Sequence, residues 1–559
     1  MSEECGCRST TTSGSSGDDK SLIRDGHKAL LSGYSFNEYE VDEVYNIMGT
    51  KSRATVLVCF LMSLFGEMFA PFGIIAPLLQ VEVPSPIFLS EQNSTDICNV
   101  SRDSWIWENK HRSLVSEFEL QCEPSMLTNL ATAVFFVPGM AIGLLAAGYI
   151  SDKFGRKKTN IFLMLGSAVS ACAMGFSTSY EMFLCFQALL GFTLGGTMVT
   201  RVLWMLEFVT ESMRPYASAI SAQFFCVGTA LVPLFDYYLQ DWRMLDFIIA
   251  VYSVICVLMM LWLPESPHWL VTNNKTKELK KTMQRLIKIN RSKLDLRDIK
   301  IIPVPQHKES GNLCIIFSDL RTLGIVVGLV FMWFLTSFFY YGFFHMIGTL
   351  NGTVHWNITI MGIMEGPCLI IAGLATTKLG RKKTMYSLLI IVMLTCLLSL
   401  FNYPISADWD SRRIFSLIGS KAGSGPMFLV VYILTLEVMP TSIRSIGMCT
   451  CSLIARLGAA SPPFFLDFCQ QYWMNLHYLV YVGLCLLGLV VTYCLPETKG
   501  QTLKQTLAEG GALKQKIISE VESSQTINKI NTSSDSSLEV ISPCEDRTDQ
   551  KPNQFGLLA

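Results

Sequence analysis

Long apolar segments separated by short polar ones fill most of the chain between residues 54 and 497. About twelve of them approach the ~20 apolar residues that an α-helix needs to cross a bilayer. The pattern therefore predicts an all-α integral membrane protein with twelve transmembrane helices. The expected spans are 56–80, 127–150, 160–177, 182–209, 216–239, 244–263, 323–346, 358–377, 385–401, 414–438, 446–468 and 476–495.

Basic residues show an asymmetry between the two sides of this predicted bundle. Lysine and arginine gather after the second, sixth and eighth spans, which all end on the same side. Since basic loops stay in the cytosol, both termini are predicted to be cytosolic. Residues 1–53 form a polar cytosolic tail in this scheme, and 498–559 form a disordered one rich in Ser, Thr and charge. Residues 271–320 form a cytosolic loop, whose helically spaced apolar residues we expect to lie against the membrane.

The longest loop on the opposite side, residues 81–126, has features of an outer segment. It holds Asn-X-Ser/Thr sites at Asn93 and Asn99, and a third site, Asn351, follows the seventh span. We predict that these three are glycosylated, although the same motif also occurs on the expected cytosolic side. Cys98 and Cys122 share the loop, and either a disulfide or two free thiols fits the sequence.

Three motifs occur twice, in the same order. GYISDKFGRKKT (148–159) is echoed by LATTKLGRKKT (374–384), LEFVTESMR (206–214) by LEVMPTSIR (436–444), and LPESPHWL (263–270) by LPETKGQTL (495–503). The repeat predicts two six-helix halves in parallel, residues 54–270 and 321–497. This plan places a substrate between the halves near the middle of the bilayer.

The repeated motifs also predict a conformational gate at the cytosolic helix ends. Each half has a glutamate seven residues before an arginine, and such a pair can form in one conformation and separate in another. The alternative is a static anchor. The small and charged residues of the first turn allow close helix packing and contact with a helix N-terminus or a carboxylate. The predicted gate residues are Gly148, Asp152, Gly155, Arg156, Glu207, Arg214, Glu437 and Arg444.

Both GRKK turns, PESPHWL and YILTLEVMPTSIRSIG (432–447) resemble the major facilitator superfamily. Within it the chain is similar to solute carrier family 22, the organic cation, organic anion and carnitine transporters. RSLVSEFELQC (112–122) and WFLTSFFYYG (333–342) match that family's patterns as well. The resemblance implies a plasma-membrane carrier of small organic ions. One departure stands out: Thr377 occupies the place of Asp152 in the second turn. We call the charged gate residues of each half a latch, and the latch of the second half is therefore expected to be lopsided.

Charged residues inside the spans are the candidate substrate ligands, because a charge at the bilayer centre costs ~3 kcal/mol or more. Glu365 lies two residues before Pro367, as in family members that carry cations or carnitine. Arg456 lies where the resemblance implies aspartate in cation carriers and arginine in anion and carnitine carriers. Lys421 is shared across much of the family, so pairing within the bundle and substrate contact are both open.

A binding site for a small zwitterion or organic anion follows as a hypothesis. Arg456 can bind a carboxylate through two parallel hydrogen bonds. Glu365 offers the opposite charge, while Trp333 and Tyr340, on one helical face, offer rings to an ammonium group. Lys421 completes the predicted substrate-binding set. The alternative is that Arg456 and Glu365 neutralise each other as a structural pair.

Three further charges within or beside the spans are harder to assign from the sequence. Glu67 can bind a coupling proton or sodium ion, or pair with a neighbouring helix. Arg201 departs from what the family resemblance implies, so it is expected either to extend to the cytosolic face or to alter selectivity. Asp236 is expected to be solvated at the outer end.

Composition excludes several other functions. Of the 559 residues only 16% are charged, against about 25% in soluble domains, and mean hydropathy is +0.38. A net charge of −1 argues against nucleic acid as a partner. Without metal-ligand spacing or a nucleophile–base motif, we expect no enzyme activity, no metal and no cofactor, with coupling to sodium or protons left open. The expected partners are a small organic ion and membrane lipid, with the chain acting as a monomer. An organic cation uniporter and a non-transporting receptor of the same fold are the alternative functions.

Overall fold

The computed structural model describes most of the membrane-embedded chain and little of its tails. The described residues are 37–39, 41–48, 53–81, 86–88, 98, 105–107, 112–210, 213–291, 299–301, 320–401, 404–405, 409–439, 444–473 and 475–499. The predicted glycosylation sites Asn93 and Asn99 lie outside these ranges. So do residues 1–36 and 500–559, which make up most of the two predicted tails.

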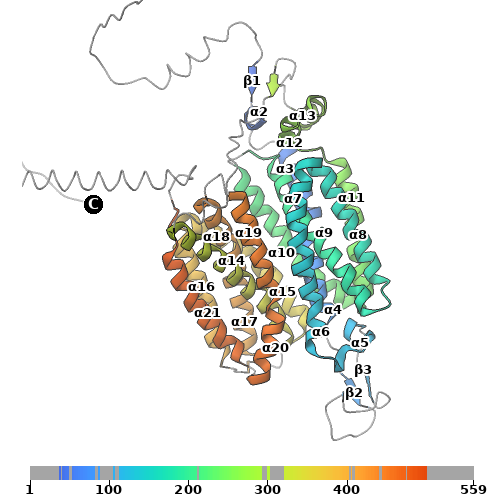
Figure 1. Ribbon diagram of the computed structural model, residues 1–559, viewed down its shortest axis with the longest axis vertical. Helices are drawn as coiled ribbons and strands as arrows, with labels where there is room; N and C mark the ends of the chain where they lie inside the picture. Colours follow the sequence, from blue (N-terminus) through green and yellow to red (C-terminus); the bar gives the residue numbers. More distant parts are fainter. Residues whose placement is uncertain are drawn as a thin grey trace, which may run out of the picture.

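Two groups of helices stand side by side in Figure 1, blue to green on one side and olive to orange on the other. The first group contains α3 (Arg53–Met62), η1 (Ser63–Glu67), α4 (Ala70–Gln80), α6 (Ser125–Val134), η5 (Phe135–Ala141), α7 (Ile142–Phe154), α8 (Arg156–Gly175), α9 (Tyr180–Leu206), α10 (Arg214–Leu239) and α11 (Trp242–Trp262). The second contains α14 (Leu320–Met346), α15 (Val354–Lys378), α16 (Arg381–Ser399), α17 (Ser411–Ile418), η9 (Gly419–Ser424), α18 (Gly425–Val438), α19 (Arg444–Ala460), α20 (Pro462–Tyr472) and α21 (Leu476–Cys494). Segments η1, η5 and η9 are π-helical turns within longer helices.

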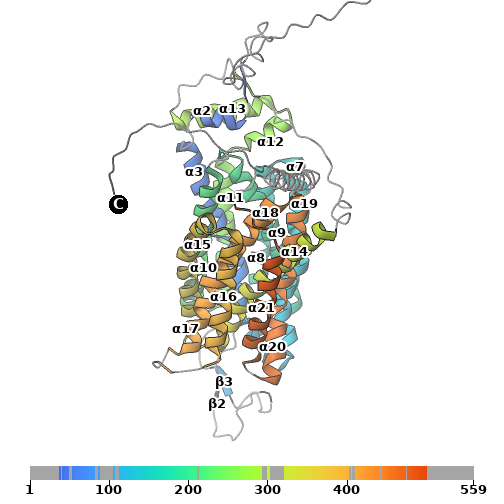
Figure 2. The same ribbon diagram turned by 90° about the vertical axis from the view of Figure 1, so that its left-hand side faces the viewer.

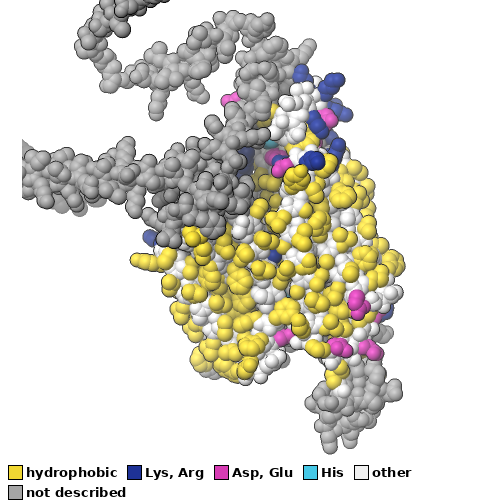
Figure 3. All heavy atoms as spheres, in the orientation of Figure 1, with side chains coloured by type: hydrophobic (Ala, Val, Ile, Leu, Met, Phe, Trp, Pro, Cys, Tyr) yellow, Lys and Arg dark blue, Asp and Glu magenta, His cyan; other side chains and the backbone are white. Residues whose placement is uncertain are grey.

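The predicted helical membrane fold is confirmed. Within the described ranges, ten helices or helix runs are long and apolar enough to cross a membrane. The other two expected spans are also helical. One is α8, which begins with a run of basic residues, and the other is divided into α19 and α20 before Pro462 and Pro463. Proline interrupts the helix there because it has no backbone N–H. Figure 3 shows hydrophobic side chains over the visible flank of the bundle, which is the surface that lipid requires.

The two ends of the bundle differ in charge and in covering elements. Helices α2 (Val41–Met48), α12 (Pro267–Thr272) and α13 (Thr276–Asn290) lie across one end, which we call the basic end (Figure 2). There the short strands β1 (Asn37–Tyr39) and β4 (Ile299–Ile301) pair in parallel. The opposite end we call the disulfide end. It carries the antiparallel strands β2 (Pro86–Phe88) and β3 (Trp105–Trp107), helix α5 (Leu114–Glu117), the short turn η4 (Leu120–Cys122) and, at the end of α14, the turn η8 (Ile347–Thr349).

The polar loops are fixed to the bundle by specific contacts. A disulfide joins Cys98 to Cys122, which decides between the two possibilities that the sequence left open. Glu117 accepts hydrogen bonds from Arg243 at 2.6 Å and from Trp242 at 2.8 Å. Burial acts to raise the pKa of the Glu117 carboxyl, but these hydrogen bonds outweigh burial and lower that pKa.

Helix α13 is amphipathic, as predicted, but its apolar face does not lie against the membrane. Leu279, Met283 and Leu286 on this face are buried against the protein, where α13 packs on α12 and α3. The prediction that this segment rests on lipid through these residues was wrong. The reason is that α12 and α3 offer apolar surface close by, which the sequence pattern of α13 alone does not reveal.

Candidate functional site

A buried ion pair lies inside the second helix group. Lys421, in η9, donates from Nζ to Glu365 Oε2 of α15 at 2.8 Å, and the two side chains are 0% and 5% exposed. The Tyr340 hydroxyl of α14 donates to the same oxygen at 3.2 Å. The charge of Glu365 is therefore compensated within the bundle, as a buried carboxylate requires. The alternative pairing of Glu365 with Arg456 was wrong.

The aromatic face of α14 is occupied by the protein's own side chains. Lys421 Nζ lies 4.0 Å from the centre of the Tyr340 ring and 4.3 Å from that of Phe344. Trp333 donates to Thr435 Oγ1 at 2.9 Å. Trp333 and Tyr340 do share one face of α14, and both contact Phe428 of α18. The Tyr340 ring face that we expected to meet a substrate ammonium is thus taken by the Lys421 ammonium.

Local backbone structure brings Lys421 to this position. The π-helical turn η9 runs through the glycine- and serine-rich segment GSKAGS, where wider helical turns meet little steric resistance. A Cβ atom on Gly425, the next residue, would lie 3.3 Å from Glu365 Oε1. Glycine at this point therefore leaves room for the carboxylate that pairs with Lys421.

Arg456 lies on α19, facing the first helix group. Its Nη1 is 3.8 Å from the Met140 sulfur of η5, its Nε is buried without a hydrogen-bond acceptor, and its guanidinium interacts with Tyr341 of α14. Among the described residues, no carboxylate oxygen comes within 4.0 Å of it. Arg456 is thus a half-buried cation without a carboxylate partner among the described residues.

The surroundings of Arg456 come from both helix groups. Phe136 of η5 packs edge-on against Tyr341, with ring centres 4.7 Å apart. Sequence reasoning missed Phe136, Met140 and Tyr341, although Tyr341 follows directly after the predicted Tyr340. A contact between segments about 200 residues apart has no local pattern, so only the folded chain reveals this shared site.

The predicted gate glutamates do form ion pairs, but with different arginines from those expected. Glu207 pairs with Arg156 at 3.0 Å, and Glu437 pairs with Arg381 at 2.6 Å. Arg214 is half-buried and is not the ion-pair partner of Glu207, while the Arg444 side chain lies outside the described residues. Glu207 therefore contacts the first residue of α8, and Glu437 contacts the first residue of α16.

The two latches are lopsided, as the sequence predicted. Arg156 also pairs with the exposed carboxylate of Asp152. In the second turn Thr377 donates its hydroxyl to the Leu374 carbonyl instead. Among the described residues, Arg381 therefore has one acidic partner where Arg156 has two.

The third repeated motif caps the helix that the first motif begins. Glu265 accepts from the Lys157 backbone N–H at 3.0 Å, and Glu497 accepts from the backbone N–H groups of Arg381 and Lys382 at 3.1 Å. Burial raises the pKa of Glu265. Burial acts in the same direction on Glu497, but the backbone donors outweigh it and lower that pKa. The two halves thus use the same cap in different electrostatic surroundings.

Glycine at the two turns permits this close approach. Gly155 and Gly380 have φ of +106° and +101°, which favour glycine, and a Cβ would lie 2.5 Å and 2.9 Å from the capping carboxylates. Gly148 was predicted to permit close helix packing as well. This was wrong, since a Cβ there would meet open space.

The basic-end latches give a first prediction. Arg381→Ala should lower the maximal transport rate about 5- to 150-fold, which corresponds to about 1–3 kcal/mol on one conformational state. Apparent affinity should change less, because Arg381 lies at the basic end and not beside Arg456. Uptake kinetics at matched surface abundance measure both quantities. Lys383→Ala, on an exposed side chain of the same turn, is the control. Unchanged kinetics in Arg381→Ala would show that the latch residues are static anchors and not a moving gate.

At the disulfide end, α10 of the first group and α15 of the second are in direct contact. His355 Nε2 lies 2.8 Å from Asp236 Oδ2, and the Asp236 side chain is fully buried. The expectation of a solvated Asp236 was wrong. Further along, a Cβ on Gly362 would come 2.6 Å from the Ala230 backbone nitrogen. Asn129 of α6 and Asp467 of α20 form a second polar contact between the groups.

This contact gives a second prediction. Asp236→Asn should weaken the contact between α10 and α15 that closes the disulfide end. The expected loss is about 1.5–3 kcal/mol, the contribution of a hydrogen bond to a charged group. A cysteine placed at Ala230, within the contact, should react at least about tenfold faster with an impermeant thiol reagent when Asp236 is replaced. Tyr238→Phe, on the 81% exposed Tyr238 nearby, is the matched control. Equal labelling in all three backgrounds would contradict a closing role.

Asn351 is exposed, but its side-chain amide donates to Asp410 at 2.8 Å, and its glycosylation stays a prediction. Arg201 is buried at 2% exposure and lies 3.0 Å from Glu67, so it does not extend to the basic end. Within the described ranges, no group of three or more His, Cys, Asp or Glu residues is placed to hold a metal ion.

Comparison with known proteins agrees with this architecture. Residues 88–508 match the family "Sugar (and other) transporter". Solute carrier family 22 member 7 of Bos taurus is 28% identical over 413 residues, covering 72% of this chain and 75% of the relative. Member 4 of Mus musculus is 27% identical over 406 residues, covering 71% and 72%. Member 3 of Mus musculus is 25% identical over 433 residues, covering 76% of each chain.

Solved structures show the same fold at lower sequence identity. The inward open conformation of the xylose transporter XylE from E. coli matches with a TM-score of 0.57 and 17% identity, over 80% of this chain and 98% of that one. A D-xylose-proton symporter matches with a TM-score of 0.54 and 16% identity, over 80% and 99%. The chain therefore belongs to the sugar (and other) transporter family of the major facilitator superfamily, its resemblance to solute carrier family 22 is confirmed, and it is a transporter, not an enzyme.

Proposed function

We propose that this protein carries small organic anions across the plasma membrane by alternating access, with Arg456 binding the carboxylate of the substrate. The single observation that carries the proposal is the charge balance of the two candidate binding groups. Glu365 and Lys421 neutralise each other at 2.8 Å, whereas Arg456 has no carboxylate partner within the described part of the chain.

The charge balance favours an anion over the other substrate classes. A simple cation would meet the like charge of Arg456. A zwitterion needs a negative or aromatic partner for its ammonium group. Both Glu365 and the Tyr340 ring already bind the Lys421 ammonium. An anion needs only the guanidinium, and the surrounding Phe136, Met140 and Tyr341 provide apolar contact for an organic group.

Transport by movement of two helix groups is supported by the position of Arg456. Its neighbours Met140 and Phe136 belong to the first group, and Arg456 and Tyr341 to the second. A substrate held here would contact both groups, so its binding would depend on how they are arranged. The latches in both halves argue against a receptor that has lost transport, because a static protein gains nothing from two such devices.

The testing experiment is an uptake panel. Cells expressing the protein at a verified surface level receive radiolabelled p-aminohippurate as a monoanion, carnitine as a zwitterion and tetraethylammonium as a cation. We expect saturable uptake of the anion above vector-only cells and above the Arg456→Ala variant. Uptake of carnitine or tetraethylammonium, with no uptake of the anion, would overturn the assignment.

The proposed orientation has both termini in the cytosol and the disulfide end outside. This assignment rests on the distribution of basic residues, which gather at the end carrying α13. The disulfide between Cys98 and Cys122 supports it, because disulfides persist in the oxidising space outside the cell. Sensitivity of Asn93 and Asn99 variants to a glycosidase tests the outer position of the loop.

A further inference from the structure

A carboxyl group is buried near the disulfide end of the first helix group, away from the site around Arg456. Asp246, one turn into α11, and Gln80, the last residue of α4, are both 0% exposed. Gln80 Nε2 donates to Asp246 Oδ1 at 2.7 Å and, at 3.5 Å, to the Trp242 carbonyl. Among the described residues, no lysine, arginine or histidine nitrogen comes within 4.0 Å of Asp246. Asp246 is therefore bound by an amide and not by a counter-charge.

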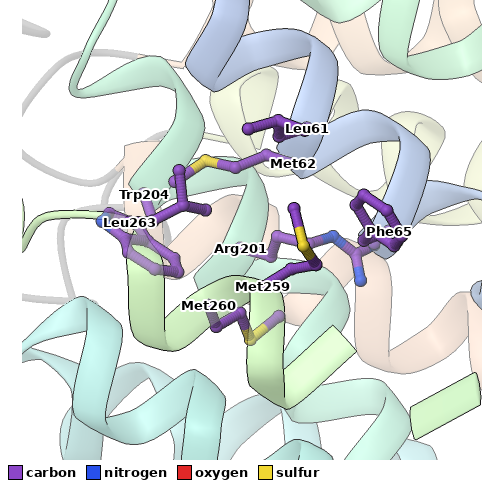
Figure 4. A pocket seen from close by; sticks show the side chains of 9 residues that line it. Leu61, Met62, Phe65, Arg201, Trp204, Met259, Met260 and Leu263 are labelled. Carbon is purple, nitrogen blue, oxygen red and sulfur yellow. The ribbon is translucent and has the colours of Figure 1, made fainter. Parts of the chain in front are cut away.

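Another buried charge of the first helix group, Arg201, does have an opposite charge beside it. The Arg201 side chain is 2% exposed and borders a cavity lined by apolar side chains such as Met62 and Met259 (Figure 4), but Glu67 lies 3.0 Å away. A buried ion without such a partner loses its hydration and gains no charge attraction in return. A buried carboxyl in that position becomes neutral by keeping its proton. The surroundings of Asp246 thus favour the carboxylic acid over the carboxylate.

Two polar atoms of the Asp246–Gln80 pair lack partners, and a proton on Asp246 would supply the missing donor. Asp246 Oδ2 and Gln80 Oε1 are both buried without a hydrogen-bond partner in the described part of the chain. Both atoms are acceptors when Asp246 is ionised, so neither satisfies the other. In the neutral acid one oxygen carries an O–H donor, while the amide oxygen stays an acceptor. The protonated form therefore removes two unsatisfied buried atoms, each of which costs free energy.

The charged groups closest along α11 are bound to other partners. Arg243 donates to Glu117 of α5 at 2.6 Å and to two backbone carbonyls at the end of α8 and just beyond it. Asp241 accepts from the Arg243 backbone N–H, and its carboxylate lies 3.6 Å from Arg112. The charge of Arg243 is thus balanced by Glu117, which leaves Asp246 without a cation of its own.

Helices α4, α8 and α10 and the turn η1 pack against α11. Within its bounds α4 has no titratable side chain. The titratable groups that the other elements and the deeper part of α11 bring to this region are Asp236, Tyr237 and Tyr238 of α10, Cys172 of α8, Glu67 of η1, and Tyr252 and Cys256 of α11. Asp236 is bound to His355, Glu67 to Arg201, and Tyr252 to a carbonyl of η1. None of the groups in that list is a cation.

We propose that Asp246 is a proton-binding site, where Oδ2 holds a proton at neutral pH and donates it to Gln80 Oε1. The proton comes from water, forms the O–H bond of a carboxylic acid and leaves Asp246 uncharged. The pair then joins the end of α4 to α11 next to Trp242, whose indole N–H donates to Glu117 of α5 at 2.8 Å. In alkaline medium the proton returns to water and leaves a buried carboxylate beside an amide oxygen, two acceptors that repel each other. The pH therefore controls how firmly α4, α11 and α5 hold together at the disulfide end.

The first test is the infrared spectrum of the purified full-length protein in lipid. A protonated carboxylic acid has a C=O stretching band that a carboxylate lacks. We expect the parent protein to show such a band at neutral pH and Asp246→Asn to lose it. Asp241→Asn, on the ion-paired aspartate that caps the same helix, is the matched control and should keep the band.

The second test is thermal unfolding as a function of pH. Between about pH 5 and about pH 8 the folded parent keeps the proton while the unfolded chain releases it, so folding loses stability as the pH rises. The unfolding temperature of the parent should therefore fall relative to that of Asp246→Asn across this range. An ionised Asp246 in the folded protein predicts no such fall.

A further variant keeps the result interpretable. Asparagine donates and accepts as the neutral acid does, so Asp246→Asn should fold as well as the parent at neutral pH. Asp246→Leu leaves the Gln80 amide without this partner and should unfold at a lower temperature than Asp246→Asn. If Asp246→Asn loses no acid band, or if it fails to fold while Asp241→Asn folds, Asp246 works as a charged carboxylate and the proton site is disproved.

Discussion

Replacing Arg456 with alanine is expected to reduce the uptake of carboxylate-bearing substrates at least about tenfold, or about 1.4 kcal/mol. The loss is expected to be large because the guanidinium is partly buried, is not paired with a carboxylate of the described chain, and offers two parallel donors to a carboxylate. Arg456→Lys should restore only part of the uptake, since an ammonium group cannot reproduce this paired geometry. Uptake of p-aminohippurate at matched surface abundance gives the measurement.

A charge reversal sharpens this prediction. Arg456→Asp should abolish anion uptake and shift the preference toward tetraethylammonium, because the local charge changes from +1 to −1 (arginine to aspartate). The matched control is Arg412→Ala, on an arginine of α17 at the disulfide end. If Arg456→Ala reaches the surface and carries carboxylates at the parental rate, Arg456 does not bind the substrate carboxylate.

Replacing Lys421 alone is expected to cause the largest loss of folded protein. Lys421→Ala leaves Glu365 buried at 5% exposure without its cation, and breaking one member of such a pair typically costs about 3–5 kcal/mol. Glu365→Gln should behave similarly, since it leaves Lys421 fully buried with its charge uncompensated. Surface biotinylation and thermal unfolding of the purified protein measure the effect.

The double variant separates a structural pair from a substrate ligand. Lys421→Met with Glu365→Gln removes both charges and should return surface abundance to near the parental level, since apolar replacements of a buried pair are often neutral. Uptake of p-aminohippurate should then recover as well, because Arg456 remains. Parental abundance in Lys421→Ala alone, together with lost uptake, would instead assign Lys421 to the substrate.

The sequence by itself determined the membrane fold and the positions of its functional segments. Hydrophobic spans are local properties, so their lengths predict helices directly. The repeated motifs located the two latches, and the place of Thr377 predicted that one of them would be lopsided. The residue types within the spans singled out Glu365, Lys421 and Arg456, because charge in an apolar segment is visible in the sequence alone.

Only the tertiary structure decided which of these charges bind each other. Glu365 faces Lys421 and not Arg456, and Glu207 faces Arg156 and not Arg214. These partners lie on different helices, at separations of about 50 residues or more, where sequence spacing has no power to predict contact. The consequence for function is direct. Pairing within the protein occupies Glu365 and the Tyr340 ring, whereas Arg456 lies between the two helix groups, where the fold places no carboxylate of the described residues beside it.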